Sequence, residues 1–83
     1  MGIRELFGKN VKYYRSCRGY SQEDLAGRCN DIKDKDALSG RAFISGIECG
    51  RRNITLDKIE ILAEALGVEP RCLFEMKHDS ERL

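Results

Sequence analysis

Three arginines near the middle of this chain of 83 residues offer its most specific chemistry. Arg41 stands at the start of a short segment with apolar periodicity, and Arg51 and Arg52 directly follow that segment. A guanidinium group is planar and donates paired hydrogen bonds, so it suits phosphates and the O6 and N7 edge of guanine. These residues therefore point to recognition of an anion or a nucleic acid.

Patterns for catalysis and metal binding are missing from the sequence. It contains one histidine, His78, and it has no glycine-rich phosphate loop and no nucleophile beside a base. The four cysteines, at positions 17, 29, 49 and 72, form no CxxC pair, whereas zinc sites bring their ligands in close pairs. We therefore expect no enzyme activity, no metal or other cofactor, no small-molecule ligand, and reduced thiols that mostly fill apolar space.

Charge is segregated along the chain, although the net charge is only +1. Residues 1–20 hold five basic residues and one acidic residue, and residues 39–53 hold three basic and one acidic. Residues 21–38 and 54–69 are acidic on balance. The two positive blocks could form one basic face of a folded domain, or they could be ordinary solvated charge.

Length and hydropathy favour a single cytoplasmic domain. A chain of 83 residues suits one domain, and no run approaches the roughly 20 apolar residues of a membrane span. The first ten residues carry charge in place of the apolar core of a signal peptide. We expect no contact with membranes, a domain over residues 1–77 and a disordered tail over residues 78–83.

Apolar residues recur at intervals of three and four along most of the chain, which predicts an all-α fold with five helices. We place these helices at residues 3–18, 21–29, 39–49, 55–66 and 70–76. Ser21 and Thr55 are expected helix caps, and Gly19 and Gly67 are expected helix stops. Residues 30–38 are charged and aperiodic, which favours a loop with at most one further helical turn.

Three segments of the chain, VKYYRSCRGYSQEDLA, RAFISGIECGRRNITL and IEILAEALGV, resemble the lambda-repressor-like, Cro-type helix-turn-helix family of DNA-binding proteins. The matching residues are Arg15, Gly19, Ser21, Gln22, Leu25, Ala26, Ile44, Ser45, Ile47, Glu48, Gly50, Leu62, Ala63, Ala65, Leu66, Gly67 and Val68. The resemblance covers most of the chain, and it is specific in combination. It implies a five-helix lambda-repressor-like domain with a central helix-turn-helix.

The third predicted helix would then be the recognition helix, whose first turn lies nearest the base edges in the major groove. We assign Arg41 to guanine readout, with a solvated or phosphate-bound arginine as the alternative. Ala42 could contact a thymine methyl group or serve as a spacer. Gly46 lowers helix stability and falls on the outward face, where it either admits DNA closely or is simply tolerated.

A second group of residues is expected to contact the DNA backbone: Gln22, Ser45, Arg51, Arg52 and Asn53. The resemblance implies that Gln22 also braces the recognition helix. It further implies an ion pair between Arg15 and Glu48, which would tie the first helix to the end of the recognition helix. The link over residues 30–38 is longer than is usual in the family, and its acidic residues should bulge away from DNA.

The strings ISGIECGRRNIT and VEPRCLFE are most similar to the controller proteins of restriction–modification systems, although short phage and chromosomal repressors share them. The resemblance implies a homodimer, and a two-fold dimer would read a palindromic operator in double-stranded DNA. The alternative is a protein-interaction module or an antitoxin that keeps the fold without specific DNA binding.

The dimer contact is expected in the C-terminal third of the chain. A stripe of Leu56, Ile59, Leu62, Ala63 and Leu66 should pack the core, which would leave Ile61 on the far side of the fourth helix. Leu73 and Phe74 follow on the fifth helix and cannot both bury easily in so small a core. We therefore assign Ile61, Ala65, Leu73 and Phe74 to the dimer interface.

Overall fold

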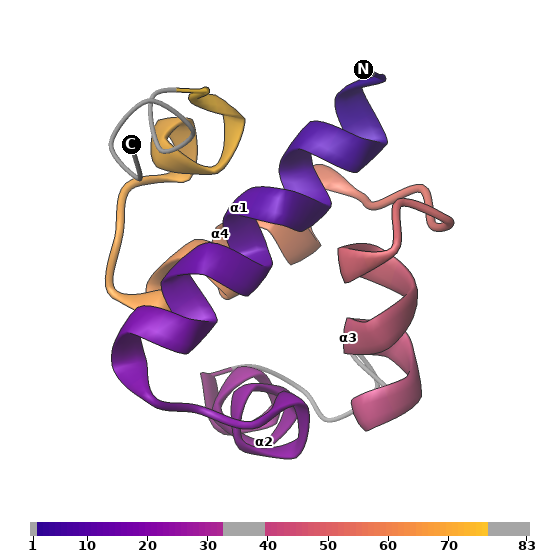
Figure 1. The fold of residues 1–83 in the computed structure, drawn as a ribbon. Coiled ribbons are helices and arrows are strands. Elements are labelled where there is room, and N and C mark those ends of the chain that lie inside the picture. Colours follow the sequence, from indigo (N-terminus) through magenta and orange to yellow (C-terminus); the bar gives the residue numbers. More distant parts are fainter. Residues whose placement is uncertain (1, 33–39, 77–83) are drawn as a thin grey trace.

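The structure, a computed structural model, describes residues 2–32 and 40–76 (Figure 1). Within these ranges the chain forms four α-helices, one 3₁₀ helix and no strand. They are α1 (Ile3–Arg18), α2 (Gln22–Ile32), α3 (Arg41–Glu48), α4 (Leu56–Leu66) and η1 (Pro70–Phe74). None of these helices is long and apolar enough to cross a membrane.

The all-α class is confirmed, but the prediction of five α-helices is wrong. The last element, η1, is a 3₁₀ helix of five residues that ends at Glu75 in extended conformation. So short a segment gains too few hydrogen bonds to offset helix nucleation, and short 3₁₀ turns are the usual outcome. Most of the expected loop, from residue 33 onward, and the expected tail lie outside the described residues.

The predicted helix ends are present where the structure describes them. The Ser21 hydroxyl accepts the Asp24 backbone N–H at 3.0 Å, and the Ser21 backbone N–H donates to the Asp24 carboxylate at 2.9 Å. These bonds hold the pKa of Asp24 below its usual range. The Thr55 hydroxyl accepts a backbone N–H from the first turn of α4 at 3.2 Å. Gly19 and Gly67 end α1 and α4 in the left-handed conformation.

The core lies where the four α-helices meet. Helix α1 packs against α3, α4 and η1, and α2 packs against α3 and α4. The buried apolar side chains are Phe7, Val11, Leu25, Ala26, Cys29, Phe43, Ile44, Ile47, Ile61, Leu62, Ala63, Ala65, Leu66 and Leu73. Helices α1 and α3 approach so closely that a Cβ on Gly8 would overlap the backbone carbonyl of Ile47. Only glycine fits at that position.

The predicted core stripe of α4 is partly wrong. Leu56, expected in the core, is 84% exposed, whereas Ile61, expected on the far side, is 4% exposed. Three elements, α1, α2 and η1, pack around α4 and enclose more of its circumference than one stripe. Leu56 is the first residue of the helix and projects beyond this packing.

The same packing overturns most of the predicted dimer surface. Ala65 and Leu73 are buried within the protomer together with Ile61, so these three side chains cannot form an exposed contact. Phe74 alone of the four assigned residues is exposed. Leu73 is buried because η1 folds back onto both α1 and α4.

Helix η1 is fastened to α1 by a buried polar side chain. Asn10 is 2% exposed, and its amide Nδ2 donates to the carbonyl oxygens of Leu73 at 2.9 Å and Glu75 at 2.8 Å. Beside it, the rings of Phe7 and Phe74 pack with their centroids 5.2 Å apart. One amide therefore satisfies two carbonyl groups at the end of η1.

Ile61 provides a direct test of this packing. Ile61→Glu would place a charge in the core and should lower the free energy of unfolding by more than about 3 kcal/mol, which urea denaturation would measure. Ile61→Val, the matched control, should cost about 1 kcal/mol and keep the fold. A glutamate variant as stable as the wild type would place Ile61 outside the core.

Candidate nucleic-acid interface

Helix α3 lies at one edge of the molecule (Figure 1). It docks on the core through Phe43, Ile44 and Ile47, which are all buried. Arg41 and Ala42, in its first turn, are exposed. The end of α3 predicted to meet base edges is therefore open to solvent.

Glu48, the last residue of α3, is held by side chains from two other helices. Its carboxylate accepts hydrogen bonds from Arg15 Nε at 2.6 Å and Arg15 Nη2 at 3.0 Å. Gln22 Nε2 donates to the same carboxylate at 3.0 Å. The side chains of Arg15 and Glu48 are only 14% and 5% exposed, and the bonds to Glu48 raise the pKa of Arg15. The ion pair and the bracing by Gln22 that the resemblance implies are both present.

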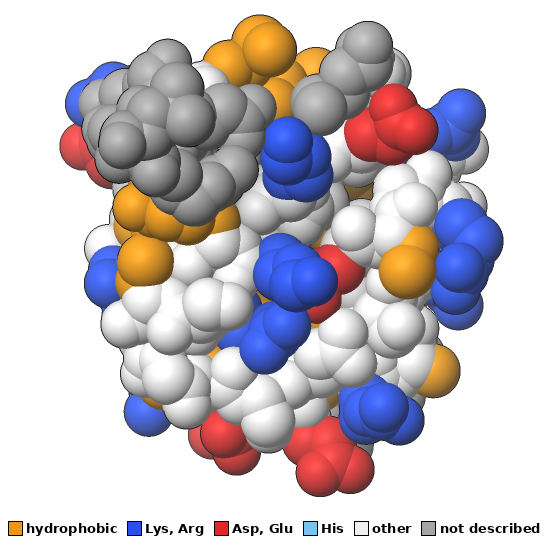
Figure 2. All heavy atoms as spheres, in the orientation of Figure 1, with side chains coloured by type: hydrophobic (Ala, Val, Ile, Leu, Met, Phe, Trp, Pro, Cys, Tyr) orange, Lys and Arg blue, Asp and Glu red, His pale blue; other side chains and the backbone are white. Residues whose placement is uncertain are grey.

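The turn after α3 reverses the chain. The Gly50 N–H donates to the Ile47 carbonyl and the Arg51 N–H to the Gly46 carbonyl, each at 3.0 Å. This paired pattern is a Schellman motif, which ends a helix and redirects the backbone. Arg51, Arg52 and Asn53 consequently line one shallow hollow with Ala42 and Gly46. Figure 2 shows lysine and arginine side chains along the edge of the molecule where α3 lies.

Gly46 does not have the open surroundings that were predicted for it. It is buried, because the side chain of Arg52 lies across it. A Cβ built on Gly46 would come within 2.9 Å of Arg52 Nε and 3.0 Å of Arg52 Cγ. Ser45, the neighbouring residue of α3 assigned to the DNA backbone, is half-buried.

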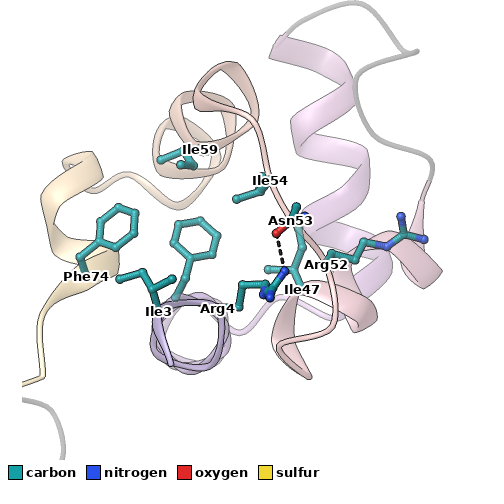
Figure 3. A pocket seen from close by; sticks show the side chains of 9 residues that line it. Ile3, Arg4, Ile47, Arg52, Asn53, Ile54, Ile59 and Phe74 are labelled. Carbon is teal, nitrogen blue, oxygen red and sulfur yellow. Dashed lines mark hydrogen bonds between the residues drawn. The ribbon is translucent and has the colours of Figure 1, made fainter. Parts of the chain in front are cut away.

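Sequence reasoning missed Arg4 and Lys58. Arg4 Nη1 donates a hydrogen bond to Asn53 Oδ1, which joins the start of α1 to the basic turn (Figure 3). Lys58 Nζ, from the first turn of α4, lies 4.9 Å from the centre of the Phe43 ring. Neither contact leaves a signal in local periodicity, because the partners are far apart in sequence.

The first basic block does not form a free basic face. Arg15 is paired with Glu48, and Arg18 Nε donates to the carbonyl of Leu66 at 2.8 Å. A cation at this end of α4 is favoured by the helix dipole. The exposed arginines beside α3 belong instead to the second block.

An apolar groove of about 190 Å³ lies on another side of the basic turn (Figure 3). It is lined by Ile3, Arg4, Phe7, Ile47, Arg52, Asn53, Ile54, Ile59 and Phe74. Ile3 and Phe74 lie at its rim, and both are partly exposed. Leu56 and Met76 are the other large exposed apolar side chains of the described residues.

The cysteines differ from one another in their surroundings. Cys29 is buried, and burial raises the pKa of its thiol to about 12, so it acts as the small apolar filler that was predicted. Cys17 and Cys49 are exposed and Cys72 is half-buried, which contradicts a filling role for most of them. Among residues 2–32 and 40–76, no three His, Cys, Asp or Glu side chains are grouped to hold a metal ion.

A family model described as helix-turn-helix matches residues 11–71. The chain belongs to the helix-turn-helix family. Regulators of this family bind DNA and are not enzymes, so the chain is a DNA-binding regulator. The two helices of the motif are α2 and α3, and α3 is the recognition helix.

The relatives of this helix-turn-helix protein include controller proteins. It is 45% identical over 74 residues to the control protein C.BamHI from Bacillus amyloliquefaciens, which covers 88% of this chain and 82% of that protein. The restriction-modification controller protein C.AhdI from Aeromonas hydrophila has a TM-score of 0.73 at 37% identity, covering 86% of this chain and 96% of the other. The hypothetical transcription factor NHTF from Neisseria has a TM-score of 0.79 at 31% identity, covering 98% and 84%.

The Glu48 contacts yield a stability test in this helix-turn-helix domain. Glu48→Gln should lower the free energy of unfolding by about 2–3 kcal/mol, because the largely buried Arg15 loses its charged partner. Urea denaturation would measure the loss. Arg71→Ala removes ion pairs to Glu69 and Glu75 from a side chain that is 73% exposed, and this control should cause no measurable loss. Equal effects of the two changes would contradict a structural role for the Glu48 contacts.

Proposed function

We propose that the chain is a sequence-specific transcriptional regulator that reads a palindromic operator in double-stranded DNA as a homodimer. The observation that carries the proposal is the recognition helix, which is braced at Glu48 and exposed at Arg41 and Ala42. The similarity to C.BamHI and C.AhdI supports a role as the controller of a restriction–modification system.

Base readout is assigned to the first turn of α3. A helix of this size fits the major groove, and its N-terminal residues come nearest to the base edges. Arg41 is exposed there and can donate two hydrogen bonds to guanine, while Ala42 offers a methyl group to thymine.

Backbone contacts are assigned to the residues around this helix. Arg51, Arg52 and Asn53 border the hollow beside α3, which suits phosphates on one strand. Gln22 stands at the N-terminus of α2, where backbone N–H groups favour an anion, and its bond to Glu48 fixes its position. Ser45 is the remaining candidate.

Arg41→Ala tests the base readout. The change should weaken binding to the operator by about 1–3 kcal/mol and leave binding to random duplex nearly intact, because only the base-specific hydrogen bonds are lost. Operator selected from a random DNA pool, followed by titration of both duplexes at one salt concentration, would measure this. Equal losses on the two duplexes would reassign Arg41 to a phosphate contact.

The dimer requires a different surface from the one predicted from the sequence. The exposed apolar side chains of the described residues are Ile3, Leu56, Phe74 and Met76. Ile3 and Phe74 flank the apolar groove, and Leu56 begins the helix that carries another groove residue, Ile59. Exposed apolar patches commonly mark interfaces, and a two-fold dimer uses the same patch on both subunits. We assign the dimer contact to this patch.

A dimer also suits the small size of the domain. One module of this size buries only about 600–1,000 Å² on DNA, whereas two recognition helices about 34 Å apart would read two half-sites. The longer site increases both affinity and specificity.

Leu56→Glu tests the dimer contact. Because Leu56 is 84% exposed, the protomer should stay folded, while a buried charge at the interface should leave a single species of 9.5 kDa in sedimentation. Leu56→Met keeps the apolar contact and should remain dimeric. A glutamate variant that still sediments as a dimer would place the interface elsewhere.

A further inference from the structure

The recognition helix carries a seat for one arginine side chain. Phe43 and Gly46 are three residues apart on α3 and therefore lie on the same face. Arg52 Cζ stands 5.0 Å from the centre of the Phe43 ring, and the stem of Arg52 runs over the bare Cα of Gly46. The backbone bonds of the turn after α3 bring Arg52 back over the helix.

The seat explains a glycine that otherwise opposes the fold. Alanine is a better helix former than glycine in the middle of a helix. A Cβ at position 46 would, however, come within 3.0 Å of Arg52 Cγ and within 2.9 Å of Nε, so the side chain would have to leave its place. The room left by Gly46 is therefore filled by Arg52 and not by a residue of the core.

The Phe43 ring concentrates positive charge at this place. It is 5% exposed, so it is held firmly by the core, and it contacts Lys58 Nζ at 4.9 Å as well as Arg52. An aromatic face attracts cations, and this offsets the repulsion between two like charges. The guanidinium is thus fixed at the edge of the hollow that Ala42, Gly46 and Asn53 also line.

We propose that Gly46 and Phe43 are positioning residues that hold the Arg52 guanidinium beside the recognition helix for contact with a DNA phosphate, and that Gly46 itself does not touch DNA. The DNA contact rests on the proposed function. Holding the side chain in place before binding removes the entropy cost of ordering a long arginine on the DNA.

A double-mutant cycle on DNA tests the proposal. Arg52→Ala should reduce affinity about tenfold, as expected for loss of a charged hydrogen bond, and lower the slope of log affinity against log salt by about 0.9. Gly46→Ala should reduce affinity and salt slope to a similar extent, because it displaces Arg52. Adding Gly46→Ala to the Arg52→Ala variant should then cause no further loss. Phe43→Leu, which keeps an apolar core residue, should likewise matter only when Arg52 is present.

A matched substitution separates positioning from stability. Gly27 lies in α2 and a Cβ there would meet nothing within 4 Å, so Gly27→Ala makes the same chemical change in open space. It should leave DNA binding unchanged. Neither alanine variant should lower the melting temperature, because both gain helix propensity. Loss of affinity on Gly46→Ala in the Arg52→Ala background would overturn the proposal in favour of direct contact between Gly46 and DNA, and so would full affinity of Gly46→Ala alone.

Nuclear magnetic resonance of the free protein tests the seat without DNA. The Phe43 ring should shift the side-chain proton resonances of Arg52, and Gly46→Ala should abolish that shift. Absence of the shift in the wild type would refute the seat even if DNA binding is normal. If the wild type shows the shift but does not bind duplex DNA at low salt, the proposed function and the phosphate contact of Arg52 fail together, while the positioning stands.

Discussion

The carboxylate of Glu48 is the contact on which the arrangement of the recognition helix depends. It is the point where α1, α2 and α3 are joined, through Arg15 and Gln22. A helix of eight residues is too short to be stable alone in water. Its orientation must therefore come from tertiary contacts, and a buried charge with several hydrogen bonds tolerates only one geometry. The apolar residues of α3 supply docking energy, whereas Glu48 sets its direction.

A second constraint is the close approach of α1 to α3. The absence of a side chain at Gly8 lets the Ile47 carbonyl come against α1, and the buried amide of Asn10 fastens η1 on the same helix. Helix α1 therefore acts as the support for the motif and for the end of the described chain. The two motif helices stay fixed relative to each other because both are packed on this shared support and on α4.

Basic residues have two separate roles in the molecule. Arg15 and Arg18 are engaged with Glu48 and with the end of α4, so much of the positive first block is part of the internal structure. Arg41, Arg51 and Arg52 stand on the exposed side of α3 and the turn after it. Charge counted along the sequence could not separate these roles, because the difference depends on which carboxylates and carbonyls lie opposite in space.

Local chemistry determined much of this protein from the sequence alone. The caps at Ser21 and Thr55 and the ends at Gly19 and Gly67 follow from hydrogen bonds within a few residues, so their types and positions predicted them. The family resemblance supplied the ion pair between Arg15 and Glu48.

Tertiary structure alone decided which apolar residues were enclosed and what covered Gly46. Ile61 is buried and Leu56 is exposed because α1, α2 and η1 surround one part of α4, and periodicity within one helix does not contain that information. Arg52 lies over Gly46 because the turn after α3 folds back. Periodicity describes the faces of a single helix, whereas burial depends on the neighbours that the whole chain brings to each face.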